Sequence, residues 1–291
     1  MTTLVQQIIN GLAAGAVYSL IAVGYNLVYG LLGFINFAHG DVYMFSTFAV
    51  LAMVLGGVPF WVAVFGGLCV AAGLGIAIER IAYRPLRRAN RMAPTVSAVG
   101  VALVLENAAQ LIWGPETRAF PTPLPQGLIR THGVVLTYMQ IIIFGTAAFL
   151  ALALSLAVYF SAWGRKLRAI RDDLPTAELM GIRVNRIVSS VYALGSMLGL
   201  ISGVLFAAYY NSVYVTMGFT GTLNAFTAAV IGGIGSISGS FIGGMLLGLV
   251  QALGTGYIAS GYANTVTFVV LIALLLFRPN GLLGKAVINR A

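Results

Sequence analysis

The sequence predicts an all-α polytopic membrane protein with about eight or nine transmembrane helices, some of them broken or re-entrant. Of its 291 residues, 59% are hydrophobic and 8% are charged, whereas about 25% charged residues are usual in a soluble domain. No charged residue precedes Asp41, and none lies in the 91 residues from Ile187 to Phe277. Because one crossing takes about 20 residues, that run contains several crossings. This composition excludes a disordered chain, a nucleic-acid-binding domain and a secreted disulfide scaffold.

The basic residues are segregated along the chain. Of sixteen Lys and Arg, five lie at 80–91, six at 165–186 and three at 278–290. The positive-inside rule assigns such clusters to the cytoplasm, so loops near 80–92 and 162–187 are expected there. The polar, proline-rich stretch 114–137 is expected to be an external loop. The net charge of +9 therefore reflects basic loops on the cytoplasmic side of a lipid bilayer. It does not indicate a nucleic-acid partner.

Residues 1–291 are expected to form a single transmembrane domain. The run 222–235 would reach only about 21 Å as a helix, less than a bilayer core of about 30 Å, which favours a half-span or re-entrant segment. The first 79 residues leave two options: three full crossings place the N-terminus outside, and one re-entrant run places it inside. The expected apolar runs lie near 4–30, 34–55, 59–79, 93–113, 138–161, 188–210, 222–235, 237–254 and 262–277.

Polar residues inside these runs are candidates for function, because an ionised group at the centre of a bilayer costs at least about 2.5 kcal/mol. They either line a translocation path or brace helix breaks through hydrogen bonds. For His39 and Asp41, bracing a helix break is the stronger interpretation. For Glu106, both the path and the brace remain open. The set is Asn36, His39, Asp41, Glu106, Asn107, Asn224, Phe226 and Thr227.

Motifs for catalysis and metal binding are absent from the sequence. No phosphate-binding G-x-x-x-x-G-K-[ST] loop occurs, and Ile237 stands where a nucleophile elbow would need Ser. No Cys or second carboxylate has ligand spacing with His39, so no metal site is expected. Glycines spaced four apart, such as Gly239 and Gly243, predict close packing between helices.

The segment WGRKLRAIRDDLPTAELMGIRVNRI predicts a short helix at the cytoplasmic face. Asp172 and Asp173 suit the N-terminal end of a helix dipole, Pro175 fits a first turn, and Gly181 suits a C-terminal cap. An ordinary basic loop is one interpretation. The other is a helix that docks into a groove on a cytosolic partner.

Four segments resemble the permease subunit of the bacterial branched-chain amino acid ABC importers, in the same order and over nearly the whole chain. They are YSLIAVGYNLVYGLLGFINFAHGDVYM (18–44), IERIAYRPLRR (78–88), GRKLRAIRDDLPTAELMGI (164–182) and FTAAVIGGIGSISGSFIGGMLLGLVQAL (226–253). The resemblance implies the architecture of an ABC importer permease in the bacterial inner membrane. It also implies a second homologous permease subunit, two cytosolic ATP-binding subunits and an external substrate-binding protein. ATP would be bound by those partners, and this chain would hold no cofactor.

On that resemblance, residues 173–181 correspond to the coupling helix that contacts the ATPase. The E-x-x-G core of the importer loop corresponds to Glu178–Gly181, although the wider E-A-A form is missing. The residues implied in coupling are Asp173, Leu174, Pro175, Thr176, Ala177, Glu178, Leu179, Met180 and Gly181.

Three alternatives remain open at this point. A permease of related architecture could carry urea, short amides or sugars. A channel or ion-coupled carrier would work without an ATPase and would use His39, Asp41 and Glu106 as proton or ion groups. A polytopic membrane enzyme has only those same three residues in its favour, without an assembled nucleophile.

Overall fold

The computed structural model describes residues 2–87, 89, 92–125, 127–131, 133–257, 260–278 and 281–283. The predicted all-α polytopic fold is confirmed. The α-helices are α1 (Thr2–Leu32), α2 (His39–Leu55), α3 (Phe60–Ile78), α4 (Met92–Trp113), α5 (Tyr138–Phe160), α6 (Ala162–Asp172), α7 (Leu174–Leu179), α8 (Val184–Tyr210), α9 (Met217–Gly232), α10 (Ile237–Tyr257) and α11 (Ala263–Phe277). A π-helical turn, η1 (Glu79–Tyr83), extends α3, and a 3-10 turn, η2 (Ser260–Tyr262), precedes α11.

Six helices in the described residues are long and apolar enough to cross a membrane: α1, α3 with its π-helical turn, α4, α5, α8 and α10. Two others, α2 and α11, are shorter apolar helices. The 16 residues of α9 reach only about 24 Å at 1.5 Å per residue, short of a full span. These helices agree with the predicted count of about eight or nine, some of them incomplete.

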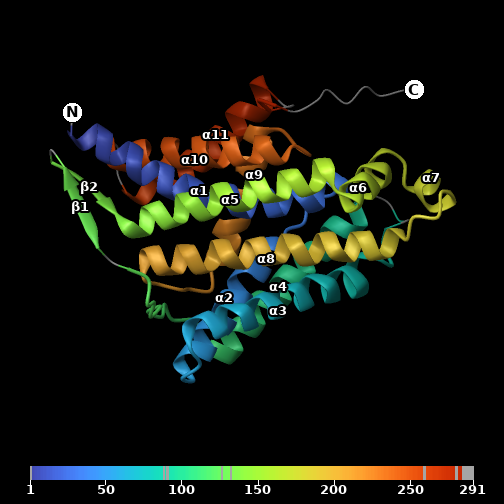
Figure 1. The fold of residues 1–291 in the computed structure, drawn as a ribbon, viewed down its shortest axis with the longest axis horizontal. Coiled ribbons are helices and arrows are strands. Elements are labelled where there is room, and N and C mark those ends of the chain that lie inside the picture. Colours follow the sequence, from blue (N-terminus) through green and yellow to red (C-terminus); the bar gives the residue numbers. More distant parts are fainter. Residues whose placement is uncertain are drawn as a thin grey trace.

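The predicted external stretch and the predicted coupling segment lie at opposite ends of the molecule's long axis (Figure 1). The first contains a small antiparallel hairpin, β1 (Leu128–Thr131) and β2 (Val134–Thr137). The sequence analysis predicted helices and loops and did not predict this hairpin. Its turn contains Gly133 at φ +80°, a backbone conformation that glycine adopts at little cost.

The start of α1 lies beside this hairpin. The side chain of Gln6 donates to the carbonyl of Val135 at 2.9 Å and accepts from its amide at 2.8 Å. The N-terminal end of α1 therefore lies at the same end of the molecule as the 114–137 stretch, opposite α6 and α7 (Figure 1). Of the first three apolar runs, α1 and α3 are long enough to cross a membrane, whereas α2 is one of the shorter apolar helices.

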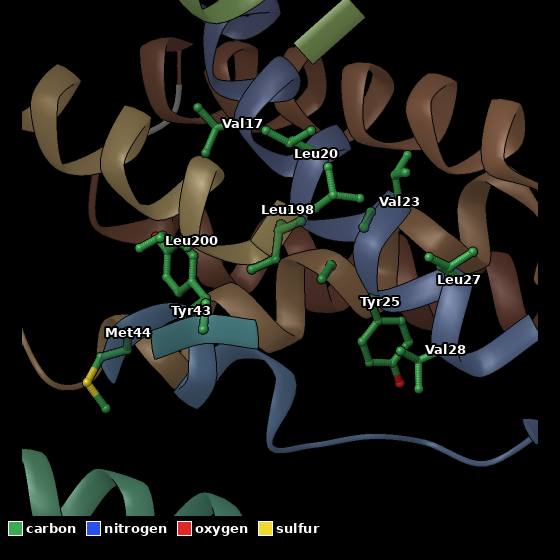
Figure 2. Packing of buried hydrophobic residues seen from close by; sticks show 14 of the residues in the cluster. Val17, Leu20, Val23, Tyr25, Leu27, Val28, Tyr43, Met44, Leu198 and Leu200 are labelled. Carbon is green, nitrogen blue, oxygen red and sulfur yellow. The ribbon is translucent and has the colours of Figure 1, made fainter. Parts of the chain in front are cut away.

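The packed core is centred on α1. Leu20 and Val23 of α1 lie among Tyr43 of α2 and Leu198 and Leu200 of α8 (Figure 2). On its other side α1 packs tightly against α10 through small residues, as the glycine spacing predicted. A Cβ on Gly248 would lie 2.2 Å from the backbone nitrogen of Gly15, and one on Gly244 would lie 2.4 Å from the Cα of Ser19.

Candidate functional site

A helix break separates α1 from α2. Asn36 lies in this break, and His39 and Asp41 lie in the first turn of α2. Helix α1 ends at Leu32, Gly33 adopts φ +71°, and α2 begins at His39. Asn36, His39 and Asp41 are all buried, each with 5% or less of its surface exposed. The start of α2 therefore lies inside the protein, where its polar groups need partners, whereas Gly33 and Phe37 of the break are exposed.

Two contacts fix the backbone around this break. The hydroxyl of Tyr83 in η1 donates to Oδ1 of Asn36 at 2.8 Å. The amide of Gly40 donates to the hydroxyl of Thr222 in α9 at 3.0 Å, and that hydroxyl donates to the carbonyl of Phe37 at 3.1 Å. Three separate segments thus meet at the start of α2, which makes it a junction rather than a free loop.

His39 and Asp41 face different neighbours from this junction. The His39 ring stands edge-to-face on Tyr25 of α1, with ring centroids 5.9 Å apart, and its Nε2 has no hydrogen-bond partner among the described residues. A Cβ on Gly218 of α9 would lie 2.5 Å from Oδ1 of Asp41. Helix α2 also packs against α4, the helix that carries Glu106. The described residues contain no group of three His, Cys, Asp or Glu that could hold a metal ion.

The candidates in α9 lie near the same core and have different surroundings. Oδ1 of Asn224 accepts from the side chains of Gln251 in α10, at 3.1 Å, and Thr267 in α11, at 3.2 Å. Phe226 packs edge-to-face on Tyr25, with ring centroids 6.1 Å apart. The hydroxyl of Thr227 is buried without a hydrogen-bond partner among the described residues. Asn224 therefore has the geometry of a brace between three helices.

Glu106 and Asn107 of α4 lie apart from the junction's hydrogen bonds. Asn107 is exposed and donates only to the carbonyl of Leu103 in its own helix, at 2.7 Å. Glu106 is half-buried. Only 17% of the most apolar stretch of α4 is buried within this chain, so polar side chains here lie on a lightly packed face.

The basic loop 162–187 contains two helices, α6 and α7, and α7 lies within the predicted coupling segment 173–181. Asp173 has an extended backbone that ends α6, and its carboxylate caps α7 by accepting from the amide of Thr176 at 3.2 Å and from the Thr176 hydroxyl at 2.6 Å. These hydrogen bonds hold the pKa of Asp173 below its ordinary value. Gly181 follows α7 with φ +78°, a conformation suited to glycine after a helix end.

Helix α7 buries one face and leaves the other open. Ala177 is buried, whereas Leu179 and Met180 are 87% and 77% exposed. Two adjacent apolar side chains this exposed at one end of the molecule are typical of a contact surface. Of the basic residues predicted around 80–92, Arg88 and Arg91 lie outside the described residues, as do Lys285 and Arg290 at the C-terminal end.

Two buried polar residues that the sequence analysis did not single out organise this architecture. Glu79, with none of its surface exposed, forms ion pairs of 2.7 Å with both Arg84 and Arg87. It also accepts from the hydroxyl of Ser189 in α8 at 2.8 Å. The hydrogen bonds that Arg84 donates to Glu79 raise the pKa of Arg84 above its ordinary value. The sequence signal was present, because Glu79 is an acidic residue at the end of an apolar run, directly before a basic cluster.

The second is Asn26, in the middle of α1. Its side chain accepts from the amide of Gly235 at 2.7 Å and donates to the carbonyl of Ser236 at 3.1 Å and the hydroxyl of Ser240 at 2.6 Å. It therefore satisfies the backbone where α9 and α10 are separated. The signal in the sequence was one amide side chain in the largely apolar stretch from Leu20 to Leu32.

Comparison with known proteins agrees with this architecture. Residues 7–277 match the family described as the permease component of branched-chain amino acid transport systems. The chain is 41% identical to the high-affinity branched-chain amino acid transport system permease protein BraD of Pseudomonas aeruginosa, covering 98% of this chain and 97% of that protein. It is 37% identical to LivH of Escherichia coli K12, a permease protein of the same description, with the same coverage.

A solved structure, PsaBC from Streptococcus pneumoniae in complex with Fab, has the same fold. Its TM-score is 0.50 at 16% identity, covering 92% of this chain and 88% of that chain. The family match over nearly all of the chain, together with two relatives above 30% identity over their full length, is decisive. The chain belongs to the family of permease components of branched-chain amino acid transport systems.

Proposed function

We propose that the chain is the membrane-spanning permease subunit of an ATP-binding cassette importer that moves branched-chain or related hydrophobic amino acids into the cell. The observation that carries this proposal is the 41% identity to BraD over 98% of the chain. The chain is a multi-pass protein of the bacterial inner membrane, and the relatives above are transport permeases and not enzymes.

Helix α7 and its flanks are the proposed contact with a cytosolic ATPase. Three features support this role: the separate capped helix, the two exposed apolar side chains Leu179 and Met180, and the position at the end of the molecule opposite the hairpin (Figure 1). An amphipathic helix that inserts into a groove on a partner needs such a face. ATP would be bound by two such partners, and an external binding protein would deliver the amino acid at the hairpin end.

The exposed face of α4 is the proposed contact with a second permease subunit. Polar side chains within membrane spans rarely face lipid, because hydrocarbon offers them no partners. Asn107 is exposed on this face and Glu106 is half-buried, so a second permease chain covering α4 would remove both from lipid. A path between two permease chains would then run past these two side chains, on a helix that packs against α2.

The small and neutral character of the core suits an amino acid cargo. Helices α9 and α10 contain no charged residue, and Asn224, Phe226 and Thr227 pack inside the chain. A path along these helices would therefore not hold a zwitterion strongly through one opposite charge.

Uptake into proteoliposomes tests the substrate class. The vesicles would contain this chain, its partner permease, the ATPases and the binding protein, and would be given labelled leucine, alanine or urea. We expect leucine uptake that needs the binding protein. Uptake of urea in preference to leucine would contradict the amino acid assignment and favour the urea and amide alternative.

Cysteine crosslinking tests the second subunit. Cys69 is exposed on α3, so the test starts from Cys69→Ser. Asn107→Cys in that background is expected to crosslink to the partner permease in native membranes. Leu152→Cys is the matched control, since Leu152 on α5 is also exposed but lies on another helix. Crosslinking of both positions to the same extent, or of neither, would contradict the α4 interface.

A further inference from the structure

The end of α7 leads directly into the first turns of α8. Four residues separate Leu179 from Val184, and the amide of Ile182 donates back to the carbonyl of Ala177 at 3.1 Å. Because Ala177 and Val184 are both buried, this connection has little slack. A displacement of α7 would therefore be applied to the start of α8.

The first turns of α8 are held to η1 by a buried carboxylate. The hydroxyl of Ser189 donates to Oε2 of Glu79 at 2.8 Å. Arg87 contacts both elements, with one nitrogen 2.7 Å from Oε1 of Glu79 and the other 2.9 Å from Oδ1 of Asn185 in α8. Charge-assisted hydrogen bonds of this kind are stronger than neutral ones, so the start of α8 and η1 are expected to move together.

The far end of η1 holds the start of α2. Tyr83, four residues after Glu79 in the same π-helical turn, is 2% exposed and donates to Asn36 at 2.8 Å. Its ring packs against Phe34, with centroids 5.3 Å apart, and against Tyr192 of α8, at 5.6 Å. π-helical turns are uncommon and are frequently found at functional sites.

We propose that Glu79 and Tyr83 are positioning residues that transmit displacement of the 173–181 segment, through Ser189 and Asn36, to the backbone junction at Asn36–Asp41. The inference rests on the proposed function, because it assigns a route between the ATPase contact and the candidate path. The two ends of η1 make different contacts: a buried ion cluster on α8 at one end and a single hydroxyl on the α2 junction at the other. Removal of the Tyr83 hydroxyl would interrupt the contact with Asn36 and would disturb the packing little.

Two buried tyrosines make a matched test. Tyr83→Phe removes the hydrogen bond to Asn36, whereas Tyr192→Phe removes a neighbouring buried hydroxyl that has no hydrogen-bond partner among the described residues. The assembled importer would be reconstituted, and both leucine uptake and ATP hydrolysis by the partner subunits would be measured. For Tyr83→Phe we expect a drop of roughly fivefold in uptake per ATP hydrolysed, the factor that corresponds to about one hydrogen bond. For Tyr192→Phe we expect the wild-type ratio.

A double-mutant cycle tests whether the two ends of η1 act in series. Ser189→Ala should also lower uptake per ATP hydrolysed. The Tyr83→Phe, Ser189→Ala double variant should have a ratio no lower than that of the more impaired single variant. Equal ratios for Tyr83→Phe and Tyr192→Phe, or multiplying effects in the double variant, would overturn the inference. If the wild-type complex itself shows no ATP-driven uptake, the proposed function fails instead, so the two failures are distinguishable.

Discussion

The backbone amide of Gly235 donates a 2.7 Å hydrogen bond to the side chain of Asn26, 209 residues earlier in the chain. The backbone between α9 and α10 turns at this point, where the carbonyl of Gly235 also accepts a hydrogen bond from Arg171 of α6 at 3.2 Å. Gly235 has φ +83°, and its amide has no helical partner. The amide side chain of Asn26 supplies the hydrogen bonds that the two helices cannot supply to each other.

Replacement of Asn26 by Leu should destabilise the protein. The change leaves the Gly235 amide and the Ser240 hydroxyl with fewer partners in a buried site, at a cost of about 2–4 kcal/mol. Thermal unfolding in detergent should show a clearly lowered midpoint. Asn107→Leu is the matched control, because Asn107 is exposed and bonds only its own helix, and its midpoint should stay near that of the wild type. Equal midpoints for the two variants would contradict the bracing role.

The close contact between α1 and α10 predicts that Gly248→Ala is poorly tolerated. The added methyl group would lie 2.2 Å from the backbone nitrogen of Gly15, so the helices must separate, at about 1–3 kcal/mol. Gly145→Ala on α5 meets nothing within 4 Å and should be neutral or stabilising by up to about 1 kcal/mol through helix propensity. Unfolding midpoints of the two variants measure the difference, and a stable Gly248→Ala protein would refute the packing argument.

The sequence was sufficient to predict most helices, because each is a long apolar run bounded by glycine, proline or charge. The break between α9 and α10 and the cap at Asp173 also followed from local residues. The division of the 162–187 loop into α6 and α7 did not follow, since it depends on the extended backbone of Asp173. The β1–β2 hairpin was missed because its four-residue strands carry too short a pattern to compete with a loop assignment.

The most important polar contacts could not be predicted, because their partners are distant in sequence. Glu79 stood next to a basic cluster and was indistinguishable from an ordinary loop residue, yet its partner Ser189 lies 110 residues away. Asn224 was expected near a path, and the structure places it in hydrogen bonds with Gln251 and Thr267. Periodicity locates helices, but it does not reveal which polar side chains meet between them.

The positive φ of Gly181 predicts different uptake for two substitutions at this position. At φ +78°, proline cannot be accommodated and would also remove the amide that donates to Glu178 at 3.0 Å. Gly181→Pro should therefore uncouple ATP hydrolysis from uptake while the protein stays in the membrane. Gly181→Asn is the matched control, because asparagine tolerates positive φ, and it should retain most uptake. Normal uptake by Gly181→Pro would contradict the coupling role of this segment.

The cap on α7 should depend on pH. The folded pKa of Asp173 lies below its ordinary value of 3.8, so the carboxylate stabilises α7 above that pH, and this contribution is lost as the pH falls through the folded pKa. Protection factors for the amides of residues 174 and 176–180, corrected for intrinsic exchange, should fall in that acid range. In Asp173→Asn, which can cap but does not titrate, they should show no such transition. An identical transition in both proteins would exclude Asp173 as its cause.

ATP dependence tests the central claim most directly. Leucine uptake by proteoliposomes that contain the complete assembly would be compared with ATP, with ADP, or with no nucleotide on the cytosolic face, and in vesicles that contain this chain alone. The account predicts concentrative uptake only for the complete assembly with ATP. Leucine uptake by this chain alone, unaffected by ATP, would contradict the importer assignment and favour a channel or carrier that uses His39, Asp41 and Glu106.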